Sequence, residues 1–474
     1  MSAPPLVVDL DGTLIRSDLL LEAALIFIRT QPWLIFKLLL WLLQGKAYLK
    51  AQLAHTVHIE VATLPYDPKV IHLIHSAQAQ GQKIVLATAS HKLYADAVAK
   101  HLGVFNQVLA TEGDLNLSAR KKRDQLVQNF GHAGFDYAGN SKDDLPVWQV
   151  ARHAYVVNPD SGVYRKALQQ GNVQALIATE HPKLKLWLKA CRLHQWMKNL
   201  LIFVPLLASH RLGHTDLLLD AALGFLFFGL CASSVYLLND LLDLADDRHH
   251  ASKRHRPFAS GSLSLQSGLL VFPVLLLLSF GGGYWLLPWQ FVAILACYYA
   301  LTLAYSMLFK RLMALDAITL AGLYTLRIIA GAIVIDGELT FWLLAFSMFM
   351  FLSLALVKRY TELRIARVQG KTVKARGRGY YPEDLEMLSS LGASSGYLAI
   401  LVLALYIQDH NTMTLYQHPK IIWLACPLLL FWITRVWLLA HRGKMHDDPV
   451  IFAIKDRVSL WIGALMGVIF WAAT

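Results

Sequence analysis

The sequence predicts two domains of different class, an N-terminal α/β domain followed by an all-α bundle of about nine membrane helices. The chain has 474 residues, which exceeds one ordinary hydrophobic core. Its hydrophobic share is 56% and its charged share 16%, a balance too apolar for a soluble protein. Apolar runs are short in the first 180 residues and long after residue 200. We therefore place the domain boundary between residues 180 and 181.

Five short apolar runs recur in the N-terminal part and are separated by helical stretches. This alternation is typical of a parallel sheet with crossover helices. The runs that we expect to form strands are Leu6–Val8, Ile84–Ala87, Val108–Ala110, Phe135–Ala138 and Ala154–Val157.

Residues 18–50 are very apolar but are interrupted by Arg29, Pro32 and Lys37. Neither half is long enough for a comfortable membrane span. One interpretation is an amphipathic hairpin that lies on the membrane as a cap of the α/β domain. The other is an ordinary buried helical cap. Both stay open, with the whole cap placed at about residues 18–80.

From Leu200 onward, nine apolar segments are long enough, or nearly so, to cross the hydrocarbon layer. They cover residues 198–211, 217–241, 266–284, 288–309, 314–335, 340–360, 390–408, 419–440 and 453–473.

Basic residues gather in the loops after the second, fourth, sixth and eighth segments, whereas alternate loops such as 336–338 are nearly neutral. By the positive-inside rule the basic side faces the cytoplasm. No secretory signal precedes the first strand, so we expect the α/β domain on that side too. The basic residues are Lys253, Arg254, Arg256, Lys310, Arg311, Lys371, Lys374, Arg376, Arg378, Arg442 and Lys444.

The net charge of +12 fits both positive-inside loops and a pocket for polyanionic substrates. The four cysteines are far apart and form no CxxC pair, so neither a zinc site nor a disulfide framework is indicated.

The strongest chemical signal is a set of carboxylates that begins beside Asn239. On a helix, Asp240, Asp243 and Asp247 fall within about 60° of one another, while Asp246 points elsewhere. Such carboxylates repel unless a cation neutralises them, and oxygen ligands without His or Cys suit Mg²⁺. Unpaired charge beside an apolar span is costly, which favours function over a solvated acidic helix end.

A cationic loop follows directly, from Arg248 to Gly261. Metal-binding carboxylates followed by Lys and Arg are typical of a diphosphate site, because the metal bridges phosphate oxygens and the cations neutralise the rest. A plain positive-inside loop would explain the charge but not this order.

The motif NDxxDxxxD followed by a basic RPxxSG loop resembles the first aspartate motif of UbiA-type intramembrane prenyltransferases. The resemblance runs from about residue 190 to the C-terminus. Four stretches resemble the branch of decaprenyl-phosphate phosphoribosyltransferases, which couple a polyprenyl phosphate to phosphoribosyl pyrophosphate. They are QWMKNLLIF at 195–203, DRHHxxKRxRPFASG at 247–261, KRYTEL at 358–363 and DPVIFAIKDR at 448–457.

This branch must hold a diphosphate, a 5-phosphate and a lipid phosphate together, so it needs several cations. We expect Asp240, Asp243 and Asp247 to be the catalytic, Mg²⁺-binding carboxylates. Arg327 lies mid-span and needs an anionic partner, either a substrate or a span carboxylate such as Asp316. The substrate-binding candidates are Lys198, Asn199, Asn239, Lys253, Arg256, Tyr305, Lys310, Arg327, Lys358 and Arg359.

The stretch Asp9-Leu-Asp11-Gly-Thr13 ends the first predicted strand and resembles the opening motif of the haloacid-dehalogenase (HAD) phosphatases, which have a Rossmann-like fold. The resemblance implies that Asp9 is the nucleophile and that Asp11 is the acid and base. Thr88 would donate to the phosphate. Lys122 would face the developing charge, although the neighbouring Lys121 stays an alternative.

The fourth HAD motif is matched by residues 139–144, with Asn140 where the family normally carries a metal-binding Asp. Asparagine coordinates through its carbonyl oxygen but brings no charge. The implied Mg²⁺ ligands are Asp9, Asp11, Asn140 and Asp144, with the charge supplied mainly by Asp9 and Asp144. A degenerate, regulatory domain is the alternative.

The fusion suggests a two-step reaction. The membrane domain would make polyprenyl-phospho-5-phosphoribose, and the phosphatase would remove the 5-phosphate to give polyprenyl-phosphoryl-ribose. We expect a multi-pass protein of a bacterial inner membrane, without a nucleic-acid partner and with self-association left open.

Three other functions are alternatives for this sequence. They are a UbiA-type enzyme that moves a prenyl group to an aromatic acceptor, a phosphatase that uses the spans as an anchor, and a transporter. A transporter would carry its carboxylates near mid-membrane rather than at a helix end.

Overall fold

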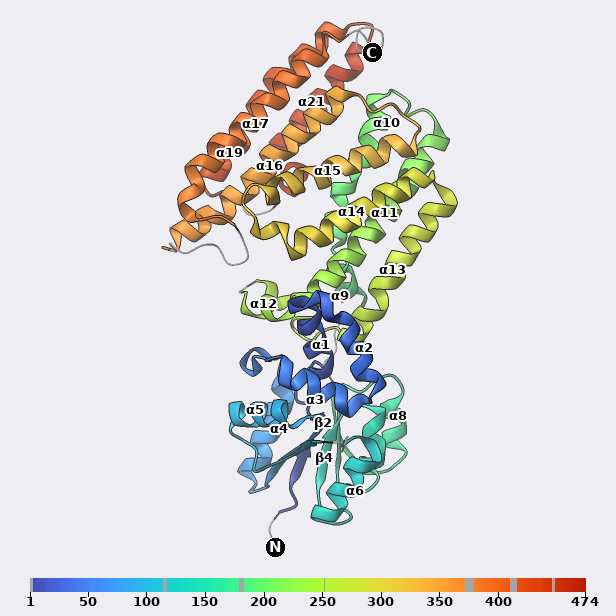
Figure 1. Ribbon diagram of the computed structural model, residues 1–474, viewed down its shortest axis with the longest axis vertical. Helices are drawn as coiled ribbons and strands as arrows, with labels where there is room; N and C mark the ends of the chain where they lie inside the picture. Colours follow the sequence, from blue (N-terminus) through green and yellow to red (C-terminus); the bar gives the residue numbers. More distant parts are fainter. Residues whose placement is uncertain are drawn as a thin grey trace. The chain divides into compact units, whose positions relative to one another are not determined.

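The computed structural model describes residues 3–113, 117–178, 183–250, 252–370, 379–409, 416–445 and 448–474. These residues form two compact units, Met1–Cys191 with Tyr236–Pro273 and Arg192–Val235 with Val274–Thr474 (Figure 1). The aspartate-rich stretch therefore belongs to the first unit, together with the α/β domain. The predicted boundary between residues 180 and 181 lies outside the described residues, as do Lys371, Lys374, Arg376 and Arg378.

The first unit contains a six-stranded parallel sheet of order β3-β2-β1-β4-β5-β6. The five predicted strands are confirmed. The sixth strand was not predicted, because its half-exposed residues at the sheet edge give only a weak apolar run. The strands are β1 (Leu6–Val8), β2 (Ile84–His91), β3 (Gln107–Thr111), β4 (Asp136–Gly139), β5 (Ala154–Val157) and β6 (Val173–Ile177).

Side chains alternate between the two faces of this sheet, as the pleat requires. Leu6 and Val8 pack with α4 and α5, whereas Val7 packs with α6, α7 and α8. In Figure 1, α4 and α5 lie to the left of the sheet and α6 and α8 to the right. These helices are α4 (Pro68–Ala79), α5 (Lys92–Leu102), α6 (Ala119–Phe130), α7 (Leu145–Trp148) and α8 (Val163–Leu168).

The cap consists of helices that differ in burial. Helix α1 (Leu19–Thr30) begins at Asp18, whose side chain accepts from the Leu21 amide, and it buries Leu19, Ala23 and Phe27. A 118° bend at Pro32 leads through η1 (Pro32–Leu34) into α2 (Ile35–Leu43), which leaves many apolar side chains exposed. Helix α3 (Lys46–Thr56) returns to the core. The buried-cap interpretation thus describes α1 but not α2.

Among the described residues, seven helices are long and apolar enough to cross a membrane, and up to nine spans result if each of two bent helix pairs counts as one. One bent pair is the cap; the other is α20 (Pro449–Lys455) with α21 (Arg457–Ala473), at 79°. The seven candidates are α11 (Thr215–Leu242), α13 (Leu265–Leu286), α14 (Trp289–Met307), α15 (Leu315–Val334), α16 (Phe341–Val368), α17 with η7 (Pro382–Tyr406) and α19 with η8 (Pro419–His441).

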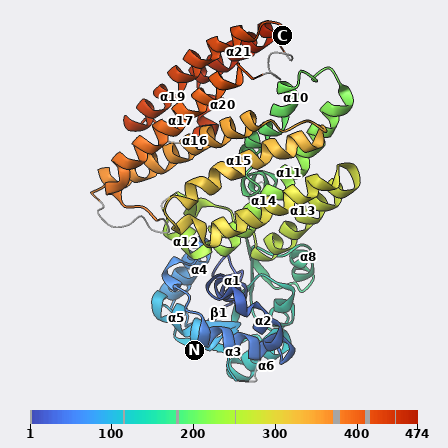
Figure 2. The same ribbon diagram turned by 45° about the horizontal axis from the view of Figure 1, so that its top comes forward.

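The second unit has its own apolar core, formed mainly by α15, α16, α17, α19 and α21. Figure 2 shows α16, α17 and α19 side by side. The prediction that residues 198–211 form a span is wrong. They fold as η4 (Leu193–Phe203) and the short α10 (Val204–Ala208), since Pro205 starts a new helix and Lys198 and Asn199 are buried polar residues.

Candidate active sites

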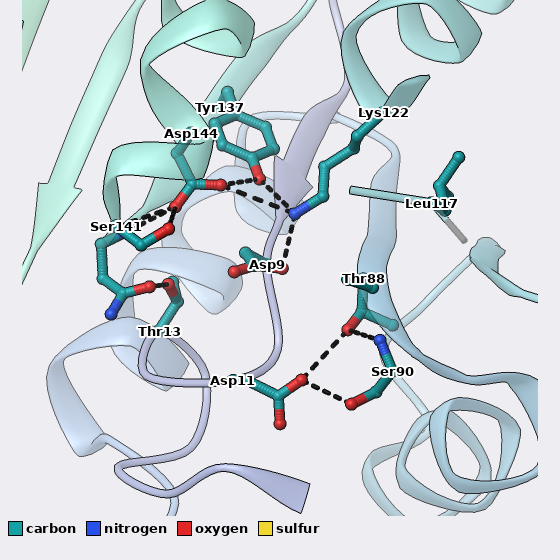
Figure 3. A network of polar contacts seen from close by, with 12 residues as sticks. Asp9, Asp11, Thr13, Thr88, Ser90, Leu117, Lys122, Tyr137, Ser141 and Asp144 are labelled. Atoms are coloured by element: carbon teal, nitrogen blue, oxygen red, sulfur yellow. Dashed lines mark hydrogen bonds and ion pairs between the residues drawn. The ribbon is translucent and has the colours of Figure 1, made fainter. Parts of the chain in front are cut away.

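The predicted phosphatase residues meet at the carboxyl ends of the central strands (Figure 3). Asp9 follows β1, where its amide donates to the Ala138 carbonyl. Lys122 on α6 is buried and its Nζ lies 2.8 Å from Asp9 Oδ1 and 3.5 Å from Asp144 Oδ1. Lys121 is exposed, so the structure favours Lys122 as the cation of the site.

Asp144 is held by donors on both of its oxygens. Its Oδ2 accepts from the amides of Asn140 and Ser141, each at 2.9 Å, and from the Ser141 hydroxyl. Its Oδ1 accepts from the hydroxyl of Tyr137 at 2.7 Å, and that hydroxyl accepts from Lys122 at 2.9 Å. Tyr137 was not predicted as a site residue. It links the cation to the fourth motif.

Asp11 lies on the opposite side of the site, facing β2. Its Oδ2 accepts from the Ser90 hydroxyl at 2.5 Å and from the Thr88 hydroxyl at 3.4 Å. Its Oδ1 accepts from the amide of Leu19, the first residue of α1. Ser90 was also missed from the sequence. The first backbone amide of the cap helix α1 therefore donates to the carboxylate that we expect to act as acid and base.

Burial raises the pKa of Asp9 to about 7, with Lys122 opposing the shift and Asp144 adding to it. Burial likewise raises the pKa of Asp11 to about 6, and the neighbouring Asp18 adds to the shift. Burial alone would lower the pKa of Lys122, but Asp9 and Asp144 hold that pKa above its ordinary value. Negative charge is therefore in excess here, an environment in which a bound cation is favoured.

The oxygens of Asp9 and Asn140 fit a hard cation such as Mg²⁺. The Asn140 carbonyl oxygen accepts from the Thr13 hydroxyl at 3.3 Å. Gly12 has a φ of +73°, and a Cβ there would lie 2.3 Å from Asn140 Nδ2. The loop after β1 thus requires glycine both for its backbone and to leave room for Asn140.

The aspartate-rich stretch is divided by a break in the helix rather than lying on one continuous face. Helix α11 ends at Leu242, and Asp243 is the N-cap of α12 (Leu244–His249). Asp240 and Asp247 both contact Arg256, at 3.1 and 2.6 Å. Asp243 contacts Arg29 on α1 of the α/β domain, at 3.1 Å.

Arg29 also binds Asp246 at 2.6 Å, so two arginines face four carboxylates in this stretch. The prediction that Asp246 points away from Asp243 is wrong, because the helix break brings both to Arg29. Among the described residues, no three carboxylate, His or Cys side chains gather as a ready metal site. The donors are nevertheless all oxygens with charge in excess of the two arginines, which fits Mg²⁺.

Arg248 of the cationic loop turns toward the α/β domain instead of the carboxylates. Its guanidinium forms a paired contact with Glu22 of α1, at 2.8 and 2.6 Å, and both side chains are buried. Glu22 also accepts from the Ser17 hydroxyl. On the same helix α12, His249 contacts Glu60 of the cap at 2.8 Å. These contacts join the aspartate motif to the cap.

In the second unit, two predicted cations share one carboxylate that was not predicted. Lys198 of η4 and Lys358 of α16 lie 2.7 and 3.0 Å from Asp448 Oδ2. Tyr324 donates to the other oxygen at 3.2 Å. A small cavity of about 30 Å³ is lined by these residues together with Leu320, Leu354, Ala355, Pro449 and Val450. Asp448 is the first residue of the motif stretch at 448–457. Its place in that motif is the sequence feature from which it could have been predicted as a site residue.

Arg327 is buried and has no carboxylate partner among the described residues. It donates to Asn199 Oδ1 at 2.9 Å and to the Tyr298 hydroxyl at 3.1 Å. Rings of Phe228 and Tyr298 surround its guanidinium at 5.1 and 4.9 Å. The Nδ2 atom of Asn199 is buried without a hydrogen-bond partner. The alternative that Asp316 neutralises Arg327 is wrong.

Asp316 instead pairs with Arg359, which is buried and lies 2.5 Å away. Arg359 also contacts Glu362 at 2.6 Å and the Tyr305 hydroxyl at 2.7 Å. Each nitrogen of this guanidinium therefore contacts a protein oxygen. Arg359 and Tyr305, two predicted substrate contacts, thus sit in a structural network.

The remaining candidates, Asn239, Lys253 and Lys310, lie at or just beyond the ends of helices. Asn239 is half-buried on the last turn of α11, and its carbonyl accepts from the Asp243 amide. Lys253 begins η5 (Lys253–His255) and is close enough to Asp247 to lower the pKa of that carboxyl, which burial raises to about 6. Lys310 lies in η6 (Phe309–Arg311), after α14.

Comparison with known families agrees with this geometry. The model of the UbiA prenyltransferase family matches residues 200–462, which is more than half of the chain. The chain belongs to the UbiA prenyltransferase family. The model of the haloacid dehalogenase-like hydrolases matches residues 6–148, so a HAD domain is fused in front of the UbiA domain.

Three relatives illustrate the range of similarity. Protein y4nM of Sinorhizobium fredii is 38% identical over 98% of this chain and 90% of its own. Nodulation protein NoeC of Azorhizobium caulinodans is 39% identical over 60% of this chain and 92% of its own. The decaprenyl-phosphate phosphoribosyltransferase of Mycolicibacterium smegmatis is 29% identical over the same shares.

Among solved structures, a UbiA homologue from Archaeoglobus fulgidus bound to DMAPP and Mg²⁺ covers 60% of this chain and 98% of its own, at 18% identity and a TM-score of 0.46. The predicted fold class is confirmed: a HAD-like parallel α/β sheet followed by a helical UbiA membrane domain. The protein is thus an integral membrane enzyme of the UbiA type that also carries a HAD hydrolase domain.

Proposed function

We propose that this UbiA protein couples a polyprenyl phosphate to phosphoribosyl pyrophosphate and that its HAD domain then removes the 5-phosphate. The observation that carries the proposal is the pair Lys198 and Lys358. Both contact Asp448, which is the one carboxylate paired with them among the residues that the structure describes. A neutral aromatic acceptor has no use for such cations, whereas a second phosphate group does. The similarity to decaprenyl-phosphate phosphoribosyltransferases supports the same substrate class.

In the first step, an oxygen of the lipid phosphate attacks the anomeric carbon of the ribose. The bond from that carbon to pyrophosphate breaks, and pyrophosphate leaves with the electron pair. Asp240, Asp243 and Asp247 would hold a Mg²⁺ ion, which would neutralise charge on the leaving group. The nucleophile is already anionic, so no strong general base is needed.

In the second step, Asp9 attacks the 5-phosphate phosphorus while Asp11 protonates the departing ribose oxygen. Water then hydrolyses the aspartyl-phosphate, with Asp11 as the base, and inorganic phosphate is released. Lys122 and the Thr88 hydroxyl would stabilise charge on the transferred group. The contacts of Lys122 with Asp9 and of Thr88 with Asp11 support these roles. Asn140 and Asp9 would hold a Mg²⁺ ion in this site, which would neutralise charge on the transferred phosphate.

The location follows the charge pattern. We place the protein in a bacterial inner membrane with the HAD domain in the cytoplasm, where phosphoribosyl pyrophosphate is available. The basic residues of the described loops, such as Lys310, Arg311 and Arg442, support this orientation.

The test supplies purified protein with polyprenyl phosphate and labelled phosphoribosyl pyrophosphate. Wild type should release pyrophosphate and inorganic phosphate and form polyprenyl-phosphoryl-ribose. Asp9→Asn should stop at the 5-phosphate lipid, and Asp243→Ala should form no lipid product. Wild type that stops where Asp9→Asn stops would overturn the phosphatase half. Failure to consume phosphoribosyl pyrophosphate would overturn the transferase half.

A further inference from the structure

Apart from Lys37, helix α2 consists of apolar residues, but the protein covers only one of its faces. Leu34, Leu38 and Trp41 pack against the core of the HAD domain, and the Trp41 ring lies 5.3 Å from that of Phe27. The opposite side is open to solvent over its whole length. Its exposed residues are Trp33 (88%), Ile35 (52%), Phe36 (54%), Leu39 (62%), Leu40 (51%), Leu42 (44%) and Leu43 (76%).

A helix that is hydrophobic all round belongs in an apolar environment, and a continuous exposed patch of this kind marks a surface that is covered in use. The neighbouring helix indicates what covers it. Arg29, at the end of α1, donates to the carbonyl of Leu242 at 3.3 Å. Leu242 is the last residue of the membrane-spanning helix α11. Within the first unit, the bend between α1 and α2 is therefore tied to the point where a span ends.

The charge of the hairpin also suits a lipid surface. Between Glu22 and Glu60 the sequence contains no Asp or Glu. Arg29 is paired with Asp243 and Asp246, and Lys50 donates to the Ala89 carbonyl. The cations of this segment that would face a lipid surface are therefore Lys37 and Lys46. Such a segment is attracted to the anionic lipids of a cytoplasmic leaflet. The exposed Trp33 is a residue type that favours the membrane interface.

We propose that α2 lies in the headgroup–acyl boundary of the same bilayer that the spans cross, with its outer face against lipid. The helix adds a second contact between the HAD domain and the membrane, besides the covalent link to the spans. Resting on the proposed function, this contact keeps the mouth of the phosphatase site at the level of a lipid headgroup, so that it hydrolyses membrane-held phosphate esters in preference to soluble ones.

The first experiment tests the contact without reference to activity. A photo-crosslinking amino acid replaces Leu39 in the full chain, reconstituted in nanodiscs that contain anionic lipid. Leu168 on α8, which is 48% exposed, is the matched control position. We expect lipid adducts from position 39 and none from position 168. Protein–protein adducts of dimer mass, or equal lipid labelling at both positions, would overturn the proposal.

The second experiment measures the consequence. The double variant Leu39→Glu/Leu43→Glu should lose about tenfold in hydrolysis of the lipid-held 5-phosphate, because two side chains no longer enter lipid. Its hydrolysis of p-nitrophenyl phosphate should stay at the wild-type rate, which also shows that the domain is folded. Leu168→Glu should match wild type on both substrates. An equal fall on both substrates, or none, would contradict the lipid-anchoring role. Lipid crosslinking without any lipid-phosphate hydrolysis by wild type would instead count against the proposed function alone.

Discussion

Lys122 contacts two carboxylates, those of Asp9, the proposed nucleophile, and of Asp144. Lys122→Met should lower kcat/KM for p-nitrophenyl phosphate by about 10²–10³-fold, since a preorganised cation no longer faces the transferred phosphoryl group. The adjacent Lys121→Met removes an exposed charge of the same kind and should retain nearly full activity. Equal losses in the two variants would contradict the assignment of Lys122.

A substitution of Lys358 tests the candidate site in the membrane domain. Lys358→Met should raise KM for phosphoribosyl pyrophosphate by about 10- to 100-fold, because a charge-assisted contact to phosphate is lost. The measurement is a steady-state transferase assay in which the KM for each substrate is determined separately. Arg367→Met, an exposed cation on the same helix α16, is the control. A loss of thermal stability with both KM values unchanged would show that Lys358 only neutralises Asp448.

At this scale the sequence identified residues that follow a strand or belong to a recognisable motif. Asp9, Asp11, Thr88 and Lys122 are of this kind, and the structure brings them into one site. Three site residues were not predicted, because each contacts a partner that lies 7 to 250 residues away in the sequence. They are Tyr137, Ser90 and Asp448. The partners of charged residues were equally difficult to predict. Asp316 was one of the alternatives considered for Arg327, but in the structure it pairs with Arg359.

Helix α1 is the element that joins the HAD domain to the aspartate motif, through the buried pair of Glu22 and Arg248. Glu22→Gln or Arg248→Met should each destabilise the folded unit by roughly 3–5 kcal/mol, because either change leaves a buried partner without its counter-charge. The double variant should lose less than the sum of the two.

The measurement is the thermal unfolding midpoint of the detergent-purified chain. Arg29→Met breaks a more exposed contact, with side-chain exposures of 23% and 27%, and should cost only about 0–1 kcal/mol. Strictly additive losses of stability in the Glu22→Gln and Arg248→Met variants would show that this ion pair does not stabilise the junction between the HAD domain and the aspartate motif.

Elements were predictable where one local rule dominated. The five strands and the long apolar helices after residue 215 needed only periodicity and length. Periodicity and length did not predict strand β6, because it is a half-exposed edge strand. They wrongly predicted a span at 198–211, because that segment is interrupted at Pro205. The break at Asp243 was missed because three carboxylates fit one face of an ideal helix equally well.

For the whole molecule, the loop charges predict that the HAD domain and the basic loops share one side of the membrane. Protease added to inside-out vesicles should remove the HAD domain, whereas right-side-out vesicles should protect it. A C-terminal tag read by immunoblot reports the cut, and a periplasmic marker protein controls vesicle orientation. Cleavage in right-side-out vesicles would reverse the topology.

The fold class and the fusion of two families could be predicted from the sequence because each family carries ordered motifs along its own stretch. The manner in which the two parts are joined could not. Arg29, Glu22 and Glu60 look like ordinary charges of a cap, and only the fold shows that they meet Asp243, Arg248 and His249.

Helix α1 has 12 residues and is therefore about 18 Å long. The amide of Leu19, its first residue, rests on Asp11, and Arg29 near its far end reaches Asp243. Inserting or deleting a single residue between them would rotate Arg29 by about 100° and break one of the two engagements. The length of α1 is consequently constrained by both contacts at once. We expect it to tolerate insertions and deletions less well than a linker between two independent enzymes would.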